Sequence, residues 1–237
     1  YSMLDDFVGN LKWFQVMLLN ATGKLSDKKL ADWLEAVFIC ISWPDSRIWC
    51  NQIGSFGGSA RTAAVAAVCS GIIASDSRMY GVGPLGMVAI FMMNLKNKIE
   101  DGWNIEKFYE KECKRKDRLF IPGYARPLAK GDERITAMER VTKNLGFSRG
   151  PHLQSAFVLS EYLYKQHGES INIGGYIVAF LCDQGFSAKE ITRTYSLIVN
   201  GGIHACYAES ADDIPNGYLP LRCDDILYTG KPERIIK

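Results

Sequence analysis

The segment from which the fold is inferred reads Gly123-Tyr124-Ala125-Arg126-Pro127-Leu128-Ala129-Lys130-Gly131-Asp132-Glu133-Arg134. It leads into a helix that we expect over residues 133–145, because Gly146 supplies a natural left-handed cap. At a helix start, a cap or a structural ion pair is the ordinary role of Asp132 and Arg134. A retained anion site is the alternative, because a guanidinium group grips a carboxylate with paired hydrogen bonds.

Outward from this segment the pattern is helical nearly throughout. In residues 28–41 apolar side chains recur at three- and four-residue spacing, which predicts an amphipathic helix. Residues 62–74 include many small side chains, which let two helix backbones approach closely, so we expect a buried helix in a crowded stack. A third helix, over residues 84–94, begins at a proline and is apolar nearly all round, so it is also predicted to be buried.

Capping residues mark further helix starts. Asn104 predicts a helix that runs to about residue 116, and Pro151 opens one that extends through Tyr164. Residues 187–190 read Ser-Ala-Lys-Glu, a capping box, and its helix should reach about Val199. The chain turns irregular after residue 211, and no segment alternates in polarity as a strand does. The prediction is an all-α fold with an extended tail.

The segment Gly54-Ser55-Phe56-Gly57-Gly58-Ser59 is a glycine-rich stretch before one of these helices. It lacks the lysine and the spacing of a phosphate-binding P-loop. We therefore expect a flexible connection between helices.

Composition and charge limit the classes of function. The chain has 237 residues, of which 47% are hydrophobic and 23% charged, as in globular proteins, and its net charge of +2 argues for neither a nucleic acid nor a membrane as partner. No apolar run approaches the roughly 18 residues that span a bilayer. Seven scattered cysteines, without a C-x-x-C pair or a secretory signal, predict reduced thiols and a cytoplasmic location.

The histidines do not have metal-binding spacing. His152, His167 and His204 lie far apart in the sequence. His204 with Cys206 and Cys182 is the one combination that could form a metal or thiol site, and we predict no metal.

Three motifs resemble those of the citrate synthase family. The segment from Gly123 is similar to the family's G-F-G-H-R motif, with Arg126, Asp132 and Arg134 at matching positions and Ala125 at the histidine. Gly83-Pro84-Leu85-Gly86 resembles G-P-L-H, with Gly86 at the histidine. Ile171-Asn172-Ile173-Gly174 resembles P-N-V-D, which carries the catalytic base, with Gly174 at the aspartate.

The resemblance covers about residues 28–235 and includes further departures from the family pattern. Ser46 stands where the pocket's third histidine is expected, and Val199 where a substrate-binding arginine is expected. Leu227-Tyr228-Thr229-Gly230 matches the family's L-Y-T-G, but Cys223 replaces an arginine before it, with Arg222 one place earlier. In length the chain is nearer to compact citryl-CoA lyase-like members.

The resemblance implies that the family's chemistry is lost. That chemistry needs a carboxylate base and two histidine donors, and Gly86, Ala125 and Gly174 have no side-chain proton donor or acceptor. Each such loss costs on the order of a hundredfold in rate or more. We therefore expect a binding or regulatory subunit without catalytic residues, acting beside an active paralogue. The alternatives are a carbon–carbon synthase or lyase (a citrate synthase-type acyltransferase) with a rebuilt site, and a structural scaffold.

The resemblance also implies an architecture and a ligand. We expect a large helical domain from residues 1–99 and 196–237, a smaller one from residues 100–195, and a homodimer that packs through residues 62–74. The candidate ligand is coenzyme A, an acyl-CoA or a carboxylate. The candidate substrate- or anion-binding residues are Arg134, Asp132, Arg126, Arg222 and Asn172.

Overall fold

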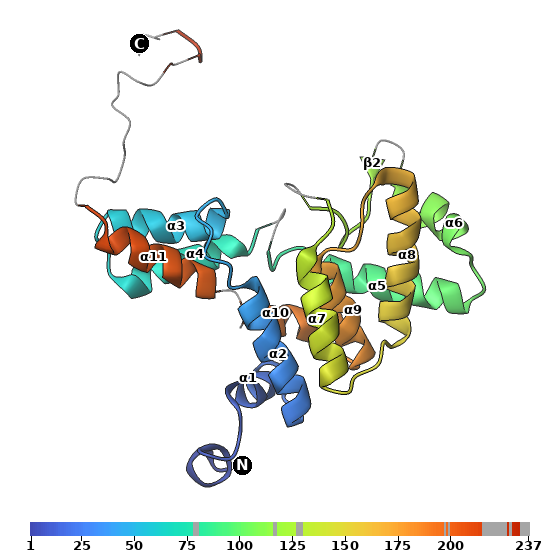
Figure 1. The fold of residues 1–237 in the computed structure, drawn as a ribbon, viewed down its shortest axis with the longest axis horizontal. Helices are drawn as coiled ribbons and strands as arrows, with labels where there is room; N and C mark the ends of the chain where they lie inside the picture. Colours follow the sequence, from blue (N-terminus) through green and yellow to red (C-terminus); the bar gives the residue numbers. More distant parts are fainter. Residues whose placement is uncertain are drawn as a thin grey trace, which may run out of the picture.

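The computed structural model describes residues 1–77, 81–115, 118–126, 130–196, 198, 200–214, 227 and 229–232. Within them the predicted all-α class is confirmed (Figure 1), and the exception is a hairpin of two-residue strands, β1 (Lys114–Arg115) and β2 (Arg118–Leu119). The helices in chain order are η1 (Met3–Phe7), α1 (Trp13–Thr22), α2 (Lys28–Ile41), α3 (Trp49–Ser59), α4 (Ala64–Ser75), α5 (Leu85–Glu100), α6 (Ile105–Phe108), η2 (Tyr109–Cys113), α7 (Glu133–Asn144), α8 (Pro151–His167), α9 (Ile173–Asp183), α10 (Ala188–Tyr195) and α11 (Gly201–Asp212).

The capping residues act as the sequence predicts. Asn104 accepts a hydrogen bond from the Lys107 N–H at the start of α6, and Ser187 and Glu190 form the predicted capping box of α10. The helix from Asn104 is shorter than expected, because η2 ends at Cys113 and the chain then enters the β1–β2 hairpin. Helix α10 also ends before the predicted limit, at Tyr195.

Helices α3, α4 and α11 pack into a group that stands apart from the other helices in Figure 1. The glycine-rich segment predicted as a connection is the second half of α3, so that prediction was wrong. A Cβ atom at Gly54 would lie 2.7 Å from the Ile203 carbonyl oxygen of α11. One at Gly58 would lie 2.4 Å from the Tyr207 carbonyl oxygen. Glycine lowers helix propensity, but here it lets two helix backbones touch.

Within the single chain, helix α4 is buried on one side only. Its small residues do pack closely: a Cβ atom at Gly57 of α3 would lie 2.3 Å from the Ala67 Cβ, and Ala67 is 4% exposed. On the other side Val65 is 76% exposed and Ile73 75% exposed. Helix α4 therefore presents an apolar surface to solvent.

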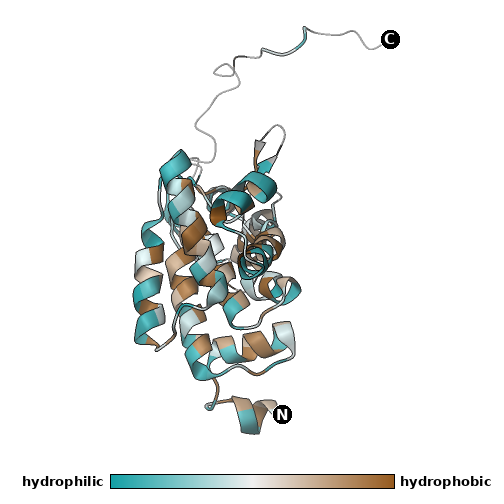
Figure 2. Cartoon of the chain, turned by 90° about the vertical axis from the view of Figure 1, so that its right-hand side faces the viewer, coloured by the Kyte–Doolittle hydropathy of each residue, from teal (hydrophilic) through white to brown (hydrophobic). Residues whose placement is uncertain are grey.

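The main hydrophobic core lies around α9, whose residues are buried along nearly the whole helix. Helices α5, α7 and α8 pack against it, and α10 packs on α5. Trp33 of α2 stacks on Phe180 at a ring distance of 3.9 Å and donates to the Thr142 hydroxyl at 2.8 Å. Figure 2 shows that the helices carry hydrophilic residues on some sides and hydrophobic residues on others.

The division into two domains stays a prediction. Helix α5, assigned to the larger domain, packs against α8 and α9 of the segment assigned to the smaller one. Helix α2 contacts both α7 and α11. In the described residues, no helix is both long and apolar enough to cross a membrane.

Candidate functional site

Two of the three motif segments lie side by side. The Ala125 N–H donates to the Ser170 carbonyl at 2.9 Å, and the Asn172 N–H donates to the Gly123 carbonyl at 3.0 Å. The Asn172 side-chain amide also donates to the Ala125 carbonyl, at 2.9 Å. These bonds join residues far apart in the sequence, so the loop before α7 is held against the start of α9.

This junction requires an unusual backbone. A Cβ atom at Gly175 would lie 2.1 Å from the Gly123 carbonyl oxygen, which only a glycine avoids. Gly123 has a φ of +86°, and Ala125 also has a positive φ, of 66°. A left-handed non-glycine residue is uncommon, and such strain gathers at functional sites.

The third motif, which contains Gly86, lies beside the same junction. A Cβ atom at Gly174 would lie 3.7 Å from the Leu85 Cδ2, and Leu85 precedes Gly86 at the start of α5. A Cβ atom at Gly86 would in turn lie 3.5 Å from the Thr192 Oγ1 of α10. The structure therefore gathers Gly86, Ala125 and Gly174 around the N-terminal ends of α5 and α9.

Asp132 connects the start of α7 to this cluster. Its side chain is fully buried and accepts from the Arg134 Nε and Nη2 at 2.8 Å each. The Ile173 N–H, next to Gly174, donates to the same carboxylate at 2.8 Å. Burial would raise the pKa of Asp132, but the hydrogen bonds and charge of Arg134 outweigh it and lower the pKa overall. The carboxylate is therefore charged at neutral pH.

One nitrogen of the Arg134 guanidinium, Nη1, is left to bind a ligand. Its side chain is 24% exposed, and its Nη1 has no hydrogen-bond partner among the described residues. Tyr195 and Cys40 lie near enough to interact with its charge. Burial raises the pKa of Tyr195 to about 12 and raises the pKa of Cys40, so both are neutral beside the guanidinium.

The remaining predicted residues have structural partners or lie elsewhere. Arg126 donates to the Glu133 carboxylate at 2.7 Å and to the Gly131 carbonyl at 3.2 Å. Asn172 caps α9 by accepting from the Gly175 N–H at 2.9 Å. Arg222 lies outside the described residues, and so do Val199 and Cys223.

The histidines take no part in this cluster. His152 pairs with Asp183 at 2.9 Å at the start of α8, and His167 bonds to the Tyr109 hydroxyl at 2.6 Å. His204 is exposed on α11. In the part of the chain that the structure describes, no three histidine, cysteine or acidic side chains are grouped to hold a metal ion.

Three residues of the cluster were not found from the sequence. Thr192 and Tyr195 lie on α10, and Cys40 lies near the end of α2. Thr192 and Tyr195 follow the predicted capping box, so helical spacing places them on α10. Nothing local links either of them, or Cys40, to the loop that carries Arg134.

Comparison with known proteins supports one fold. No protein-family model matches the sequence, and no curated protein matches it significantly. The citryl-CoA lyase of Hydrogenobacter thermophilus matches with a TM-score of 0.80 and 22% identity, over 100% of this chain and 91% of that one.

Two further solved structures match over much less of their own length. An ATP citrate lyase of Methanosaeta concilii in complex with (3S)-citryl-CoA gives a TM-score of 0.73 and 18% identity, over 94% of this chain and 38% of that one. A citrate synthase of Thermoplasma acidophilum, in complex with carboxymethyl coenzyme A and oxaloacetate, gives a TM-score of 0.68 and 18% identity. This match covers 95% of this chain and 58% of that one. The chain thus has a citrate synthase-like fold.

Proposed function

We propose that this chain is a non-catalytic binding or regulatory subunit with a citrate synthase-like fold. The observation that carries the proposal is the cluster at the starts of α5 and α9. There Gly86, Ala125 and Gly174 occupy the three motif positions, and none of these three residues has a side chain that can transfer a proton. The nearby Asp132 is charged and already accepts from Arg134 and from the backbone, so it is not free to act as a base.

The ligand we propose is a carboxylate or an acyl-CoA beside the free Nη1 of Arg134. The Nη1 group can donate to one carboxylate oxygen, and the neighbouring Tyr195 and Cys40 are neutral and add no negative charge there. The structure of a Methanothrix soehngenii ATP citrate lyase contains citrate and coenzyme A, which supports this class of ligand. With one nitrogen available, affinity should be no better than the high micromolar range, about −5 kcal/mol.

A thiol-release assay with acetyl-CoA and oxaloacetate tests the loss of catalysis. We expect no turnover above the uncatalysed rate, and Ala125→His alone should not restore it, because catalytic groups act as a unit. Turnover near ordinary enzyme values, about 10 per second, would favour the alternative of a rebuilt acyltransferase or lyase site. Cleavage of citryl-CoA should be measured in parallel.

A calorimetric titration tests ligand binding at Arg134. The titrants are coenzyme A esters and di- and tricarboxylates, added to the unmodified protein, to Arg134→Leu and to Arg140→Leu. Arg140 is a matched control because it is exposed on the same helix. We expect a ligand whose binding is lost in Arg134→Leu and kept in Arg140→Leu. Equal binding in all three proteins would make Arg134 a structural residue, and no binding to any of them would favour a scaffold.

We also propose a homodimer that packs through α4, as the exposed Val65 and Ile73 support. Ala67 is buried within the chain, so the exposed side carries the contact. Association with an active paralogue would use the same or a neighbouring surface.

A further inference from the structure

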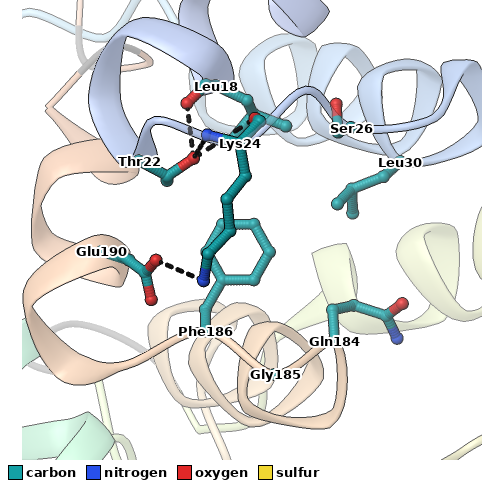
Figure 3. A pocket seen from close by; sticks show the side chains of 9 residues that line it. All are labelled: Leu18, Thr22, Lys24, Ser26, Leu30, Gln184, Gly185, Phe186 and Glu190. Atoms are coloured by element: carbon teal, nitrogen blue, oxygen red, sulfur yellow. Dashed lines mark hydrogen bonds and ion pairs between the residues drawn. The ribbon is translucent and has the colours of Figure 1, made fainter.

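A cavity of about 180 Å³ lies between the end of α1, the start of α2 and the turn from α9 to α10 (Figure 3). It is at the far end of α9 from Gly174, roughly 16 Å away along an 11-residue helix. It is therefore separate from the candidate site described above. Its lining includes Leu18, Lys24, Ser26, Leu30, Phe186 and Glu190.

One part of the lining is apolar. Leu18 is fully buried, Leu30 is 8% exposed, and both come from the helices α1 and α2. The Phe186 ring faces them from the turn before α10. An engineered apolar cavity of about 150 Å³ is large enough to hold benzene, so this cavity suits a ring or short chain of similar size.

The rim carries an ion pair. Lys24 Nζ lies 2.9 Å from the Glu190 carboxylate, and the Lys24 side chain is 72% exposed while that of Glu190 is 17% exposed. Glu190 also accepts from the Ser187 N–H and hydroxyl, at 2.9 and 2.7 Å. The hydrogen bond from Lys24, with those from Ser187, lowers the pKa of Glu190 to about 2.

The groups left for a ligand at this rim are hydrogen-bond donors of Lys24. Both Glu190 oxygens already accept hydrogen bonds, whereas the Lys24 ammonium has no other hydrogen-bond partner among the described residues. An ammonium group has three donors, so two remain. Arg193 also reaches this interface, donating to the Ala21 carbonyl at 3.5 Å. A carboxylate complements this edge better than a cation does.

The lining also holds an unsatisfied hydroxyl. Ser26 Oγ is buried and has no hydrogen-bond partner in the part of the chain that the structure describes. Because this oxygen has almost no accessible surface, a ligand in the cavity is not expected to reach it.

We propose that this cavity binds a small monocarboxylate with an apolar ring or short chain. The carboxylate accepts from Lys24 at the rim, and the apolar body packs on Leu18, Leu30 and Phe186. Glu190 at the rim belongs to α10, the helix that also carries Thr192 beside Gly86 of the candidate site.

Benzoate is the probe, titrated into the full-length protein by calorimetry. A ligand of this size should bind with a dissociation constant of about 1 mM. Benzamide, which keeps the ring without the charge, should bind about tenfold more weakly or worse. In methyl-labelled protein, the Leu18 and Leu30 resonances should shift with benzoate while those of Leu153, in the core of α8, should not.

The variant pair is Lys24→Met and Lys28→Met. Both lysines are exposed and ion-paired, the second with Asp32 at 2.5 Å, but only Lys24 lines the cavity. Lys24→Met should weaken benzoate binding about tenfold or more, and Lys28→Met should leave it unchanged. The absence of saturable binding to the unmodified protein would overturn the proposal. Equal binding of benzoate to both variants would overturn it as well.

Discussion

The ion pair between Asp132 and Arg134 should be a major contributor to stability, and Asp132→Asn tests this. One carboxylate oxygen, Oδ2, accepts from both the Arg134 Nη2 and the Ile173 N–H, and Oδ1 accepts from the Arg134 Nε. An asparagine has one acceptor oxygen and one amino group. Whichever way it is turned, it places a donor against at least one donor and removes the charge.

The magnitude follows from the burial of the two partners. Removing one member of a buried pair costs about 3–5 kcal/mol. Arg134 keeps a side-chain exposure of 24%, so solvent recovers part of this loss. We therefore expect a cost of about 2–4 kcal/mol, which for a chain of this length lowers Tm by about 5–15 °C. The exposed Asp101 on the end of α5 provides the control, and Asp101→Asn should change Tm by about 1 °C or less.

The pH dependence gives a second readout. Because the folded-state pKa of Asp132 is lowered, its contribution is complete above the unfolded value of about 3.9 and disappears as pH falls through the lower folded value. The difference in Tm between the unmodified protein and Asp132→Asn should therefore shrink below about pH 4. An Asp132→Asn protein that melts within about 1 °C of the unmodified one at neutral pH would refute the reasoning, as would a difference independent of pH.

Two further predictions concern glycines and the surface of α4. Gly175→Ala should lower the free energy of unfolding by several kcal/mol or prevent folding, because the new Cβ would lie 2.1 Å from the Gly123 carbonyl oxygen. Gly86→Ala, whose Cβ would have its nearest contact at 3.5 Å, should be neutral or stabilising by up to about 1 kcal/mol. Urea denaturation of the two variants checks this, and equal midpoints would contradict the packing at the start of α9. Ile73→Arg, which places a charge on the exposed side of α4, should convert a dimer to a monomer in light scattering, while Val158→Arg on α8 should not. A monomeric unmodified protein would contradict the dimer.

Much of the fold is encoded locally. The helix over residues 28–41 has the predicted bounds, because three- and four-residue spacing of apolar side chains describes one buried face. Asn104 and Ser187 cap helices because their side chains reach the N–H groups three residues ahead. Motif spacing in the segment from Gly123 led to the citrate synthase-like fold, which the structural matches support.

The glycine-rich half of α3 shows where local rules fail. Propensity disfavours glycine in a helix, so residues 54–59 read as a connection. In the structure Gly54 and Gly58 face α11, where any side chain would collide with the backbone of that helix. Packing with a helix some 150 residues later in the chain, not local preference, keeps this segment helical.

The candidate site also combines features that the sequence reveals with features that only the tertiary structure sets. The residue identities at Gly86, Ala125 and Gly174 are visible in the sequence, and so is the Asp132–Arg134 pair, because its partners are two residues apart. Other features depend on segments that are distant in the sequence. Ile173 donates to the Asp132 carboxylate, and Lys24 pairs with Glu190 beside a cavity. Tyr195 and Cys40 lie near enough to Arg134 to interact with its charge. Helical periodicity tells which side of a helix is apolar, but not which other helix covers it. Only the packed tertiary structure decides that.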